Sequence, residues 1–231
     1  MMSPCILNDM TDLNSQFEEF LKTHTGGSHS ELQQEKFVLM ILKNKPNGFF
    51  VEFGAMDGLR ASNTYFLETA HGWQGIVSEP NPRHRDNLSK NRRCQIDFRC
   101  VSDQSGQRVQ FATASESGFP GMVGHIYREQ NTRGEVVEIE TVNLNELLDQ
   151  CSAPDVIDYI SVDTDGSEPM IMRAYDFSRR RVNIWTIEHN QEPWREEILD
   201  LMEKNNYTRV LVEKSRYDDW YVHNDILKGL V

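Results

Sequence analysis

The sequence predicts an α/β fold, with a seven-stranded, mostly parallel sheet, helices on both faces and an antiparallel final strand. Short apolar segments of strand length alternate with helix-length segments along the chain, as they do where helices connect parallel strands. Several apolar segments run straight into a turn that carries glycine or an acid, which is how parallel strands end at the ligand edge of an open sheet. The 231 residues, of which 38% are hydrophobic, can bury one substantial core.

The first expected strand, residues 49–53, runs into the turn Gly54-Ala55-Met56-Asp57-Gly58. Such a turn indicates a nucleotide-type ligand, because its backbone N–H groups can face a bound molecule. An acid in the turn would repel a pyrophosphate but attract a ligand that carries an ammonium or sulfonium group. S-adenosylmethionine is the common cofactor of that description. From this stretch we expect four residues at the cofactor: Glu52, Gly54, Ala55 and Asp57.

The second expected strand, residues 75–78, ends at Glu79, which is 25 residues after Gly54. A carboxylate about 20 residues beyond the glycine turn, at the tip of the second strand, can accept hydrogen bonds from both ribose hydroxyls. We therefore expect Glu79 to bind the ribose, with Pro80 next to it at the cofactor.

The chain resembles a known family in several motifs that occur in the same order. They are Gly48-Phe49-Phe50-Val51-Glu52-Phe53-Gly54-Ala55-Met56-Asp57-Gly58, Ser62-Asn63-Thr64, Gly72-Trp73-Gln74-Gly75, Glu79-Pro80-Asn81-Pro82 and Asp158-Tyr159-Ile160-Ser161-Val162-Asp163-Thr164-Asp165-Gly166-Ser167-Glu168. Together they are similar to the FkbM-type S-adenosylmethionine-dependent methyltransferases, over about residues 30–223. The resemblance implies a class I methyltransferase (Rossmann-like) fold. It also implies O-methylation of a hydroxyl on a sugar, a glycolipid or a related natural product.

Residues 1–29 are expected to form an N-terminal helical extension, and residues 30–231 the methyltransferase domain. A helix over about residues 30–43, capped by Ser30, is expected before the first strand. Ser30 and the string Gln34-Glu35-Lys36-Phe37 resemble a segment at this place in the family. That resemblance implies a role in closing over the cofactor, and core packing of Phe37 is the alternative.

The helix after the glycine turn, residues 61–70, is expected to open on the cofactor. Asn63, near its start, either caps the helix or contacts the methionine carboxylate of the cofactor. A polar helix over residues 83–91 and a third strand over residues 95–101 are expected next. In this architecture the loop after the third strand lies beside the adenine. Val101 and Ser102 are therefore candidates to flank the base or to bind its amino group.

Residues 104–142 are expected to be an insertion. Residues 107–113 and 135–141 alternate in polarity, which predicts an antiparallel pair of strands. The polar, glycine-rich segment between them is either disordered or a substrate lid, and we favour the lid. A short helix is expected to follow, opened by Asn143 with Glu146 three residues later.

The fourth and fifth strands, residues 156–162 and 183–188, deliver acids to one edge of the sheet. Acids and an amide at these strand ends can bind a divalent cation such as Mg²⁺, which would lower the pKa of a substrate hydroxyl and direct it at the methyl group. The metal candidates are Asp163, Glu188 and Asn190, with Asp165 as a substitute. In the metal-free alternative, His189 or Asp163 is the general base. In a third interpretation Asp165-Gly166-Ser167 is only a turn and helix cap, and Asp163 only a cofactor ligand.

A helix over residues 193–204, a strand over residues 207–212 and an edge segment over residues 219–223 are expected to complete the sheet and its cover. We expect neither a second domain nor an internal repeat.

Composition excludes several classes of function. The formal net charge of −12 argues against a nucleic acid partner, because such binding depends on Lys and Arg at phosphates. The basic clusters at residues 83–85, 92–93 and 179–181 are expected on the solvated surface, and binding of an anionic lipid or glycan substrate by one of them is the alternative. The four cysteines lack a C-x-x-C spacing, which disfavours a zinc site or disulfide scaffold and indicates a reducing, cytoplasmic setting. No apolar stretch is long enough for a membrane span.

Two other functions are weighed against the methyltransferase. One is an NAD-linked oxidoreductase, which the acid in the glycine turn and the missing G-x-G-x-x-G count against. The other is a non-catalytic nucleotide-type binding module that keeps the pocket without the chemistry. The expected partner is a small-molecule or glycan hydroxyl acceptor, whose identity the sequence does not give.

Overall fold

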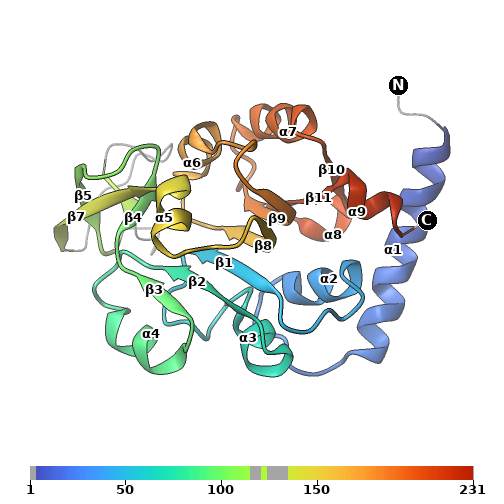
Figure 1. Ribbon diagram of the computed structural model, residues 1–231, viewed down its shortest axis with the longest axis horizontal. Helices are drawn as coiled ribbons and strands as arrows, with labels where there is room; N and C mark the ends of the chain where they lie inside the picture. Colours follow the sequence, from blue (N-terminus) through green and yellow to red (C-terminus); the bar gives the residue numbers. More distant parts are fainter. Residues whose placement is uncertain (1–3, 115–120, 124–134, 231) are drawn as a thin grey trace.

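The computed structural model describes residues 4–114, 121–123 and 135–230, and its centre is a seven-stranded sheet (Figure 1). The strand order is β10-β11-β9-β8-β1-β2-β3. The bounds are β1 Phe49–Phe53, β2 Gln74–Ser78, β3 Gln95–Asp97, β8 Val156–Val162, β9 Arg181–Glu188, β10 Tyr207–Val210 and β11 Asp218–His223. Neighbouring strands from β9 to β3 pair in parallel. Strand β11 runs antiparallel to both of its neighbours, so the sheet is mixed.

A second sheet of four strands, in the order β4-β7-β5-β6, lies beside the end of β3 (Figure 1). Its strands are β4 Cys100–Ser102, β5 Arg108–Ala112, β6 Gly121–Met122 and β7 Val136–Asn143. Strands β5 and β7 are the two alternating segments of the insertion, and they pair antiparallel with Val109 opposite Ile139. Most of the expected substrate lid falls on residues 115–120 and 124–134, which lie outside the described residues.

The expectation of one continuous third strand over residues 95–101 is wrong. The chain bends between β3 and β4, and β4 leaves the central sheet to pair with β7. The bend is held by Asp97, whose carboxylate accepts a hydrogen bond from the backbone N–H of Arg99 at 2.8 Å and from its guanidinium group at 2.6 Å. A local side-chain bond of this kind competes with the strand ladder.

Nine helices are described, and α1 to α7 divide between the two faces of the central sheet. Their bounds are α1 Pro4–Thr23, α2 Gln34–Ile41, α3 Tyr65–His71, α4 Arg85–Asn91, α5 Leu144–Gln150, α6 Glu168–Ala174, α7 Arg195–Lys204, α8 Val212–Ser215 and α9 Asn224–Lys228. Helices α5 to α7 pack on one face, where their apolar side chains meet Val51 and Ile160. Helices α1 to α4 pack on the other face against Phe50 and Tyr159 (Figure 1). The alternation of Phe50 and Val51 along β1 supplies both cores.

Helix α2 begins later than the sequence predicts, and Ser30 is not its cap. Gln33 occupies the N-cap position with φ 66° and makes no side-chain capping bond. The Ser30 hydroxyl instead donates to the carboxylate of Glu35, which is fully buried and also accepts the backbone N–H of His29 at 3.2 Å. Segment 29–35 is thereby folded over the start of the helix.

The N-terminal helix α1 is packed onto the domain through aromatic side chains. Phe17 contacts Trp220 edge-on at 5.8 Å between ring centroids, and Phe37 of α2 stacks on the same indole at 4.6 Å. Phe37 is therefore a core residue. Within the residues described, no helix combines the length and apolar character needed to cross a membrane.

Candidate functional site

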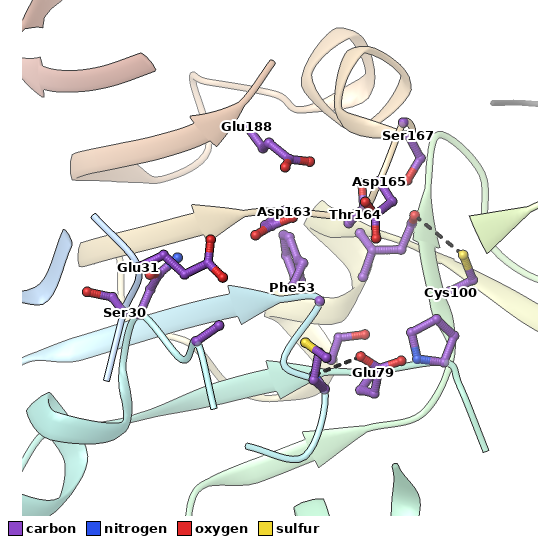
Figure 2. A pocket seen from close by; sticks show the side chains of 18 of the residues that line it. Ser30, Glu31, Phe53, Glu79, Cys100, Asp163, Thr164, Asp165, Ser167 and Glu188 are labelled. Carbon is purple, nitrogen blue, oxygen red and sulfur yellow. Dashed lines mark hydrogen bonds between the residues drawn. The ribbon is translucent and has the colours of Figure 1, made fainter. Parts of the chain in front are cut away.

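A pocket of about 660 Å³ lies at the edge of the central sheet where the parallel strands end (Figure 2). That volume is typical of a site for a small molecule or cofactor. The residue after β1, Gly54, and the residue after β2, Glu79, line it together with the loop after β8 and the last residue of β9, Glu188. In Figure 2, Glu79 lies at one end of the pocket and Glu188 at the other.

The structure brings about half of the residues predicted for the site to this pocket. Those that line it are Gly54, Asn63, Glu79, Pro80, Val101, Asp163 and Glu188. Those that do not line it are Glu52, Ala55, Asp57, Ser102, His189 and Asn190. For these six residues the structure corrects the expected place at the pocket, and local contacts explain why each of them lies elsewhere.

The glycine turn serves close packing more than ligand binding through its backbone. Gly54 has φ +73°, and a Cβ added to it would stand 1.8 Å from the carbonyl oxygen of Asp163. The N–H groups of Gly54 and Ala55 both donate to the Ser78 carbonyl, at 3.1 and 3.3 Å, and the N–H of Met56 donates to Glu79 at 2.8 Å. These three groups are used within the protein. A pyrophosphate would find none of them free.

Glu79 links the ends of β1 and β2 and is 4% exposed. One carboxylate oxygen accepts the N–H of Met56 and the other accepts the N–H of Asn81 at 2.7 Å. Burial raises the pKa of Glu79 to about 6, against the lowering effect of these two hydrogen bonds. Each oxygen keeps a further lone pair, so the carboxylate can accept additional hydroxyl donors.

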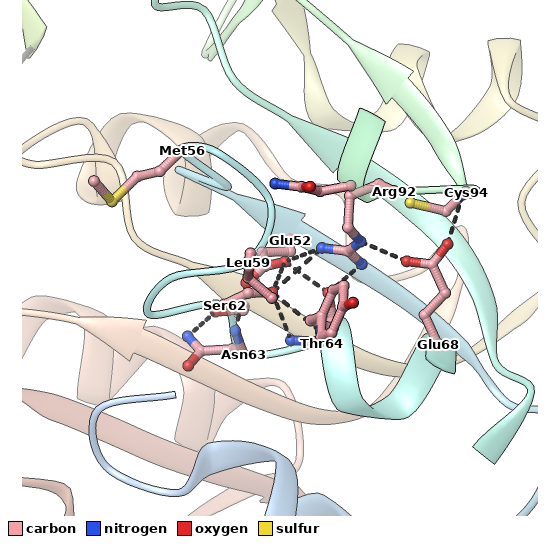
Figure 3. Close-up of polar contacts among 12 residues, drawn as sticks. Glu52, Met56, Leu59, Ser62, Asn63, Thr64, Glu68, Arg92 and Cys94 are labelled. Atoms are coloured by element: carbon pink, nitrogen blue, oxygen red, sulfur yellow. Dashed lines mark hydrogen bonds and ion pairs between the residues drawn. The ribbon is translucent and has the colours of Figure 1, made fainter. Parts of the chain in front are cut away.

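Glu52 is turned toward the protein interior, which corrects its assignment to the cofactor. It accepts hydrogen bonds from the hydroxyls of Ser62 at 2.9 Å and Thr64 at 2.6 Å, and from the guanidinium of Arg92 at 3.0 Å (Figure 3). A buried carboxylate with this many donors is already satisfied. Asp57 is likewise occupied, because it accepts the backbone N–H groups of Leu59 and Arg60 at 3.0 and 2.9 Å and holds the turn.

Asn63 lines the pocket and is 5% exposed. Its side-chain NH₂ donates to the Ser161 hydroxyl at 2.8 Å, and its carbonyl oxygen Oδ1 has no hydrogen-bond partner within the described part of the chain. The Ser62 hydroxyl accepts the N–H groups of Thr64 and Tyr65 at 3.3 and 3.0 Å, at the start of α3. Ser62, two residues before the N-cap residue Thr64, thus binds N–H groups at the start of the helix, and Asn63 does not.

An apolar wall, of which the sequence predicted only Val101, lines the pocket beside Glu79. Its members are Cys100, Val101, Phe111 and Met122. Phe111 and Met122 come from the insertion, so β5 and β6 bring the insertion to the site. Ser102 is not part of the wall, because its hydroxyl donates to Asp103 at 3.0 Å.

A second wall comes from the N-terminal segment. His29, Ser30, Glu31 and Gln34 line the pocket together with Tyr217, which precedes β11. The Tyr217 hydroxyl donates to Glu31 at 2.5 Å, and the Gln34 side chain donates to Asp218 at 2.8 Å. The resemblance of Ser30 and Gln34 to the family was the available signal for this wall.

Three carboxyl groups lie in a row across β8, β9 and β11. Val162 is paired in register with Ile187, so Asp163 and Glu188 follow side by side, and Asp218 is paired with Glu188. Burial and the charge of Glu188 raise the pKa of Asp163 well above its usual range. Burial and the neighbouring Glu168 and Asp165 raise the pKa of Glu188 to about 8. Adjacent carboxyl groups of this kind do not all ionise together, so Asp163 and Glu188, which are partly buried, retain protons near neutral pH.

Neither His189 nor Asn190 lines the pocket. Both backbone N–H groups donate to the carbonyl of Tyr217, at 2.8 and 3.1 Å. His189 is 1% exposed, and its Nδ1 accepts the backbone N–H of Gln191 at 3.0 Å. Asn190 and Gln191 both have positive φ, of 47° and 61°, so the chain reverses directly after β9. Burial also lowers the pKa of His189, which keeps the imidazole neutral. Because His189 does not line the pocket, the structure does not bring this candidate base to the site.

The expected magnesium site finds no support. Across residues 4–114, 121–123 and 135–230, no three His, Cys, Asp or Glu side chains are grouped to hold a metal ion. Asn190, the third candidate ligand, instead hydrogen-bonds Glu188 and so opposes the rise in the pKa of that group.

Comparison with solved structures finds distant similarity. The chain is similar to precorrin-6y C5,15-methyltransferase from Geobacter metallireducens GS-15, with 15% identity, a TM-score of 0.43 and coverage of 76% of this chain and 71% of that chain. It is similar to the O-methyltransferase from Bacillus cereus in complex with SAH, with 13% identity, a TM-score of 0.43 and coverage of 90% and 89%. For the METTL16 MTase domain the identity is 8%, the TM-score 0.45 and the coverage 81% and 64%. At these TM-scores the likenesses carry no argument about substrate.

Comparison with protein families is decisive. None of the curated proteins compared with the chain matches it. The sequence model of the family described as "Methyltransferase FkbM domain" matches residues 52–209, which is more than half of the chain. Several of the motifs on which the sequence resemblance depends lie inside this match. The chain belongs to the FkbM methyltransferase family.

Proposed function

We propose that this protein transfers the methyl group of S-adenosylmethionine to a hydroxyl group of a sugar, a glycolipid or a related small molecule. The observation that carries the proposal is one continuous pocket lined by Glu79 at the end of β2 and by Asp163 and Glu188 at the ends of β8 and β9. A cofactor bound at Glu79 and an acceptor bound at Asp163 and Glu188 would lie in the same pocket. Direct transfer depends on that proximity and orientation.

The residues present fit the cofactor. Glu79 would accept the ribose hydroxyls with its free lone pairs, and Pro80 and Val101 would flank the adenine. Asn63, with its unpartnered carbonyl oxygen, would lie at the amino acid end. When bound, the cofactor supplies an electrophilic methyl group on a sulfonium centre. Glu79, with a pKa of about 6, is ionised at pH 7, and a carboxylate in the lining favours such a cation.

The row of carboxyl groups would provide the base. A hydroxyl held beside Asp163 and Glu188 can pass its proton to whichever carboxyl group is ionised. A general base works best when its pKa lies near the working pH, and burial brings the pKa of Glu188 to about 8. We assign Glu188 as the proton acceptor and Asp163 as the partner that shares the proton.

The charge of the pocket supports a neutral or cationic acceptor. Glu31, Asp163, Asp165 and Glu188 line it, and Arg60 and His29 are the basic side chains among its described lining residues. Sugar hydroxyls can donate to carboxylates, whereas a polyanion such as a nucleic acid would be repelled. We therefore propose a polyhydroxylated acceptor and no nucleic acid.

The two alternatives have less support. An NAD-linked oxidoreductase needs N–H groups for a pyrophosphate, and those of Gly54, Ala55 and Met56 are already bonded. A non-catalytic binding module has no need for two adjacent carboxyl groups with raised pKa values, Asp163 and Glu188, in its pocket.

The test begins with calorimetric titration of the protein with S-adenosylmethionine, S-adenosylhomocysteine and NAD, repeated on Glu79→Ala. We expect binding of the first two ligands, none of NAD, and weaker binding in the variant. Transfer of labelled methyl groups to a panel of sugars and glycolipids then tests the reaction, with equal rates expected in EDTA and in added Mg²⁺. Absence of binding to both adenosyl ligands would refute the proposal, and binding without transfer to any hydroxylated acceptor would favour the binding module.

A further inference from the structure

Arg92, directly after α4, is a buried charge in the middle of a polar network (Figure 3). Its side chain is 0% exposed, although the sequence predicts a solvated basic cluster at residues 92–93. The guanidinium group donates to the carboxylates of Glu52 at 3.0 Å and Glu68 at 2.5 Å. It also donates to the Thr64 hydroxyl at 2.8 Å. A guanidinium group has five donors in a fixed plane, which lets it bind these three groups and the Ser62 hydroxyl, at 3.3 Å, at once.

Glu52 connects Arg92 to the segment before α3. The same carboxylate that binds Arg92 accepts the hydroxyls of Ser62 and Thr64, and it accepts the backbone N–H of Asn63 at 2.5 Å. Hydrogen bonds to a charged group are shorter and stronger than neutral ones, and in a buried site they fix geometry. The position of the Asn63 backbone is therefore set by a carboxylate that Arg92 holds.

The loop between β1 and α3 also packs directly on Arg92. Gly58 has φ +78°, and a Cβ there would stand 2.7 Å from Cγ of Arg92 and 2.7 Å from Leu88. Asn91, beside Arg92, donates its side-chain NH₂ to the carbonyl of Asp57 at 2.8 Å. The loop between β1 and α3 therefore packs against the end of α4.

The other side of the same loop faces the pocket. Its members Met56, Arg60, Ala61 and Asn63 line the cavity, whereas Arg92, Glu52 and Glu68 do not. Asn63 is the point where the two sides meet. Its backbone is held by Glu52, and its side chain is held by Ser161 next to the β8 end.

We propose that Arg92 is a positioning residue for the cofactor pocket: acting through Glu52, it holds the loop of residues 56–64, and Asn63 in particular, in the geometry that binds S-adenosylmethionine. This inference rests on the proposed function, because it assigns the pocket to that cofactor. Arg92 itself touches neither the cavity nor the groups that would react. Lysine in its place would keep the positive charge but not the planar fork, and the loop would lose part of its support.

The experiment compares dissociation constants for S-adenosylmethionine, by calorimetry, with melting temperatures in five proteins: the full-length wild type, Arg92→Lys, Asn63→Ala, the double variant and Arg195→Lys. Arg195 is the matched control, because it also binds a carboxylate through two nitrogens, at 2.9 and 2.8 Å to Asp219, and neither residue lines the pocket. We expect Arg92→Lys to raise the dissociation constant about tenfold. Arg195→Lys should change the dissociation constant by no more than about twofold, although the two variants lose a comparable amount of melting temperature.

The double variant tests the route of the effect. If Arg92 acts through Asn63, Arg92→Lys should weaken binding by less than about twofold in the Asn63→Ala background, because coupled residues are not additive. Full multiplication of the two losses would overturn the inference, and so would equal affinity in the Arg92 and Arg195 variants. Failure of the wild type to bind S-adenosylmethionine would instead refute the proposed function, and the two failures are therefore distinct.

A milder variant covers the case in which Arg92→Lys does not fold. Thr64→Val removes the hydroxyl that joins Arg92 to Glu52 and leaves their charges paired. We expect it to weaken binding about threefold with a cooperative melting transition, and unchanged affinity would overturn the inference.

Discussion

Gly54 approaches Asp163 so closely that a Cβ on the glycine would stand 1.8 Å from the Asp163 carbonyl oxygen. The contact joins the loop after β1 to the loop after β8, so the two halves of the pocket depend on it. Backbone cannot yield as a flexible side chain does. We therefore expect Gly54→Ala to lose about 4 kcal/mol or more of unfolding free energy, together with measurable binding of S-adenosylmethionine.

Gly106 is the control for that prediction. It has the same φ of +73°, but nothing lies within 4 Å of a Cβ built on it. Gly106→Ala should show only the cost of a left-handed conformation, about 1–2 kcal/mol, with unchanged cofactor affinity. Urea unfolding and calorimetry on both variants measure the difference. Similar losses in the two would mean that the Gly54 contact with Asp163 is unimportant.

Glu79 should make the stability of the protein depend on pH. Burial raises its pKa from 4.5 to about 6, so the folded state holds a proton that the unfolded state has already lost between these values. Stability from this group therefore falls as pH rises through that window, by about 2 kcal/mol. Glu79→Gln lacks the titration, so the free energy of unfolding of the wild type should fall relative to that of the variant between pH 4.5 and pH 7. A constant difference across the window would contradict the displaced pKa.

Cofactor affinity should change with pH in the opposite direction. The ionised carboxylate of Glu79 is the better acceptor for ribose hydroxyls, and it predominates above about pH 6. The dissociation constant of S-adenosylhomocysteine should therefore rise as pH falls below that value. The same titration on Glu79→Gln should be weaker and flat, and a wild type that binds equally well at pH 5 and pH 7 would refute Glu79 as the ribose ligand.

Glu188 and His189 are consecutive in sequence but should behave differently as variants. Glu188→Gln removes the proposed base and should lower kcat by about 10²–10⁴-fold while cofactor binding persists. His189→Asn keeps an acceptor for the Gln191 N–H and should retain activity with a modest loss of stability. Because the ionised form of Glu188 is the active one, kcat/KM of the wild type should rise with pH to about 8 and then level off. Loss of turnover in the His189 variant with retention in the Glu188 variant would reverse the assignment.

The sequence predicts the central elements of this fold well because their signals are local. The run of residues 156–162 is mostly apolar and bounded by turn residues, and β8 has those bounds. The bend between β3 and β4 depends on one side chain, Asp97, bonding to a residue two positions away, and an alternating pattern gives no sign of it.

The site is harder to predict than the fold, because a local sequence pattern shows neither which way a side chain points nor which distant residue it contacts. Glu52 and Arg92 are 40 residues apart and satisfy each other inside the protein, although the sequence assigns one to the cofactor and the other to the surface. His189 follows an acidic strand end and is expected at the edge of the sheet. The positive φ angles of Asn190 and Gln191 turn the chain away from the pocket, and no sequence pattern specifies that turn.

Arg92 should also be a large contributor to stability, in contrast to an exposed arginine with equally short contacts. Arg92→Ala leaves Glu52 and Glu68, whose side chains are 4% and 8% exposed, without their cation, and removal of one partner of a buried pair costs about 3–5 kcal/mol. Arg173 binds Glu197 through two nitrogens at 2.5 Å, but the two side chains are 46% and 49% exposed. Solvent screens that pair, so Arg173→Ala should cost about 0–1 kcal/mol. Urea unfolding of both variants at pH 7 measures the contrast, and equal losses would show that burial does not govern these ion pairs.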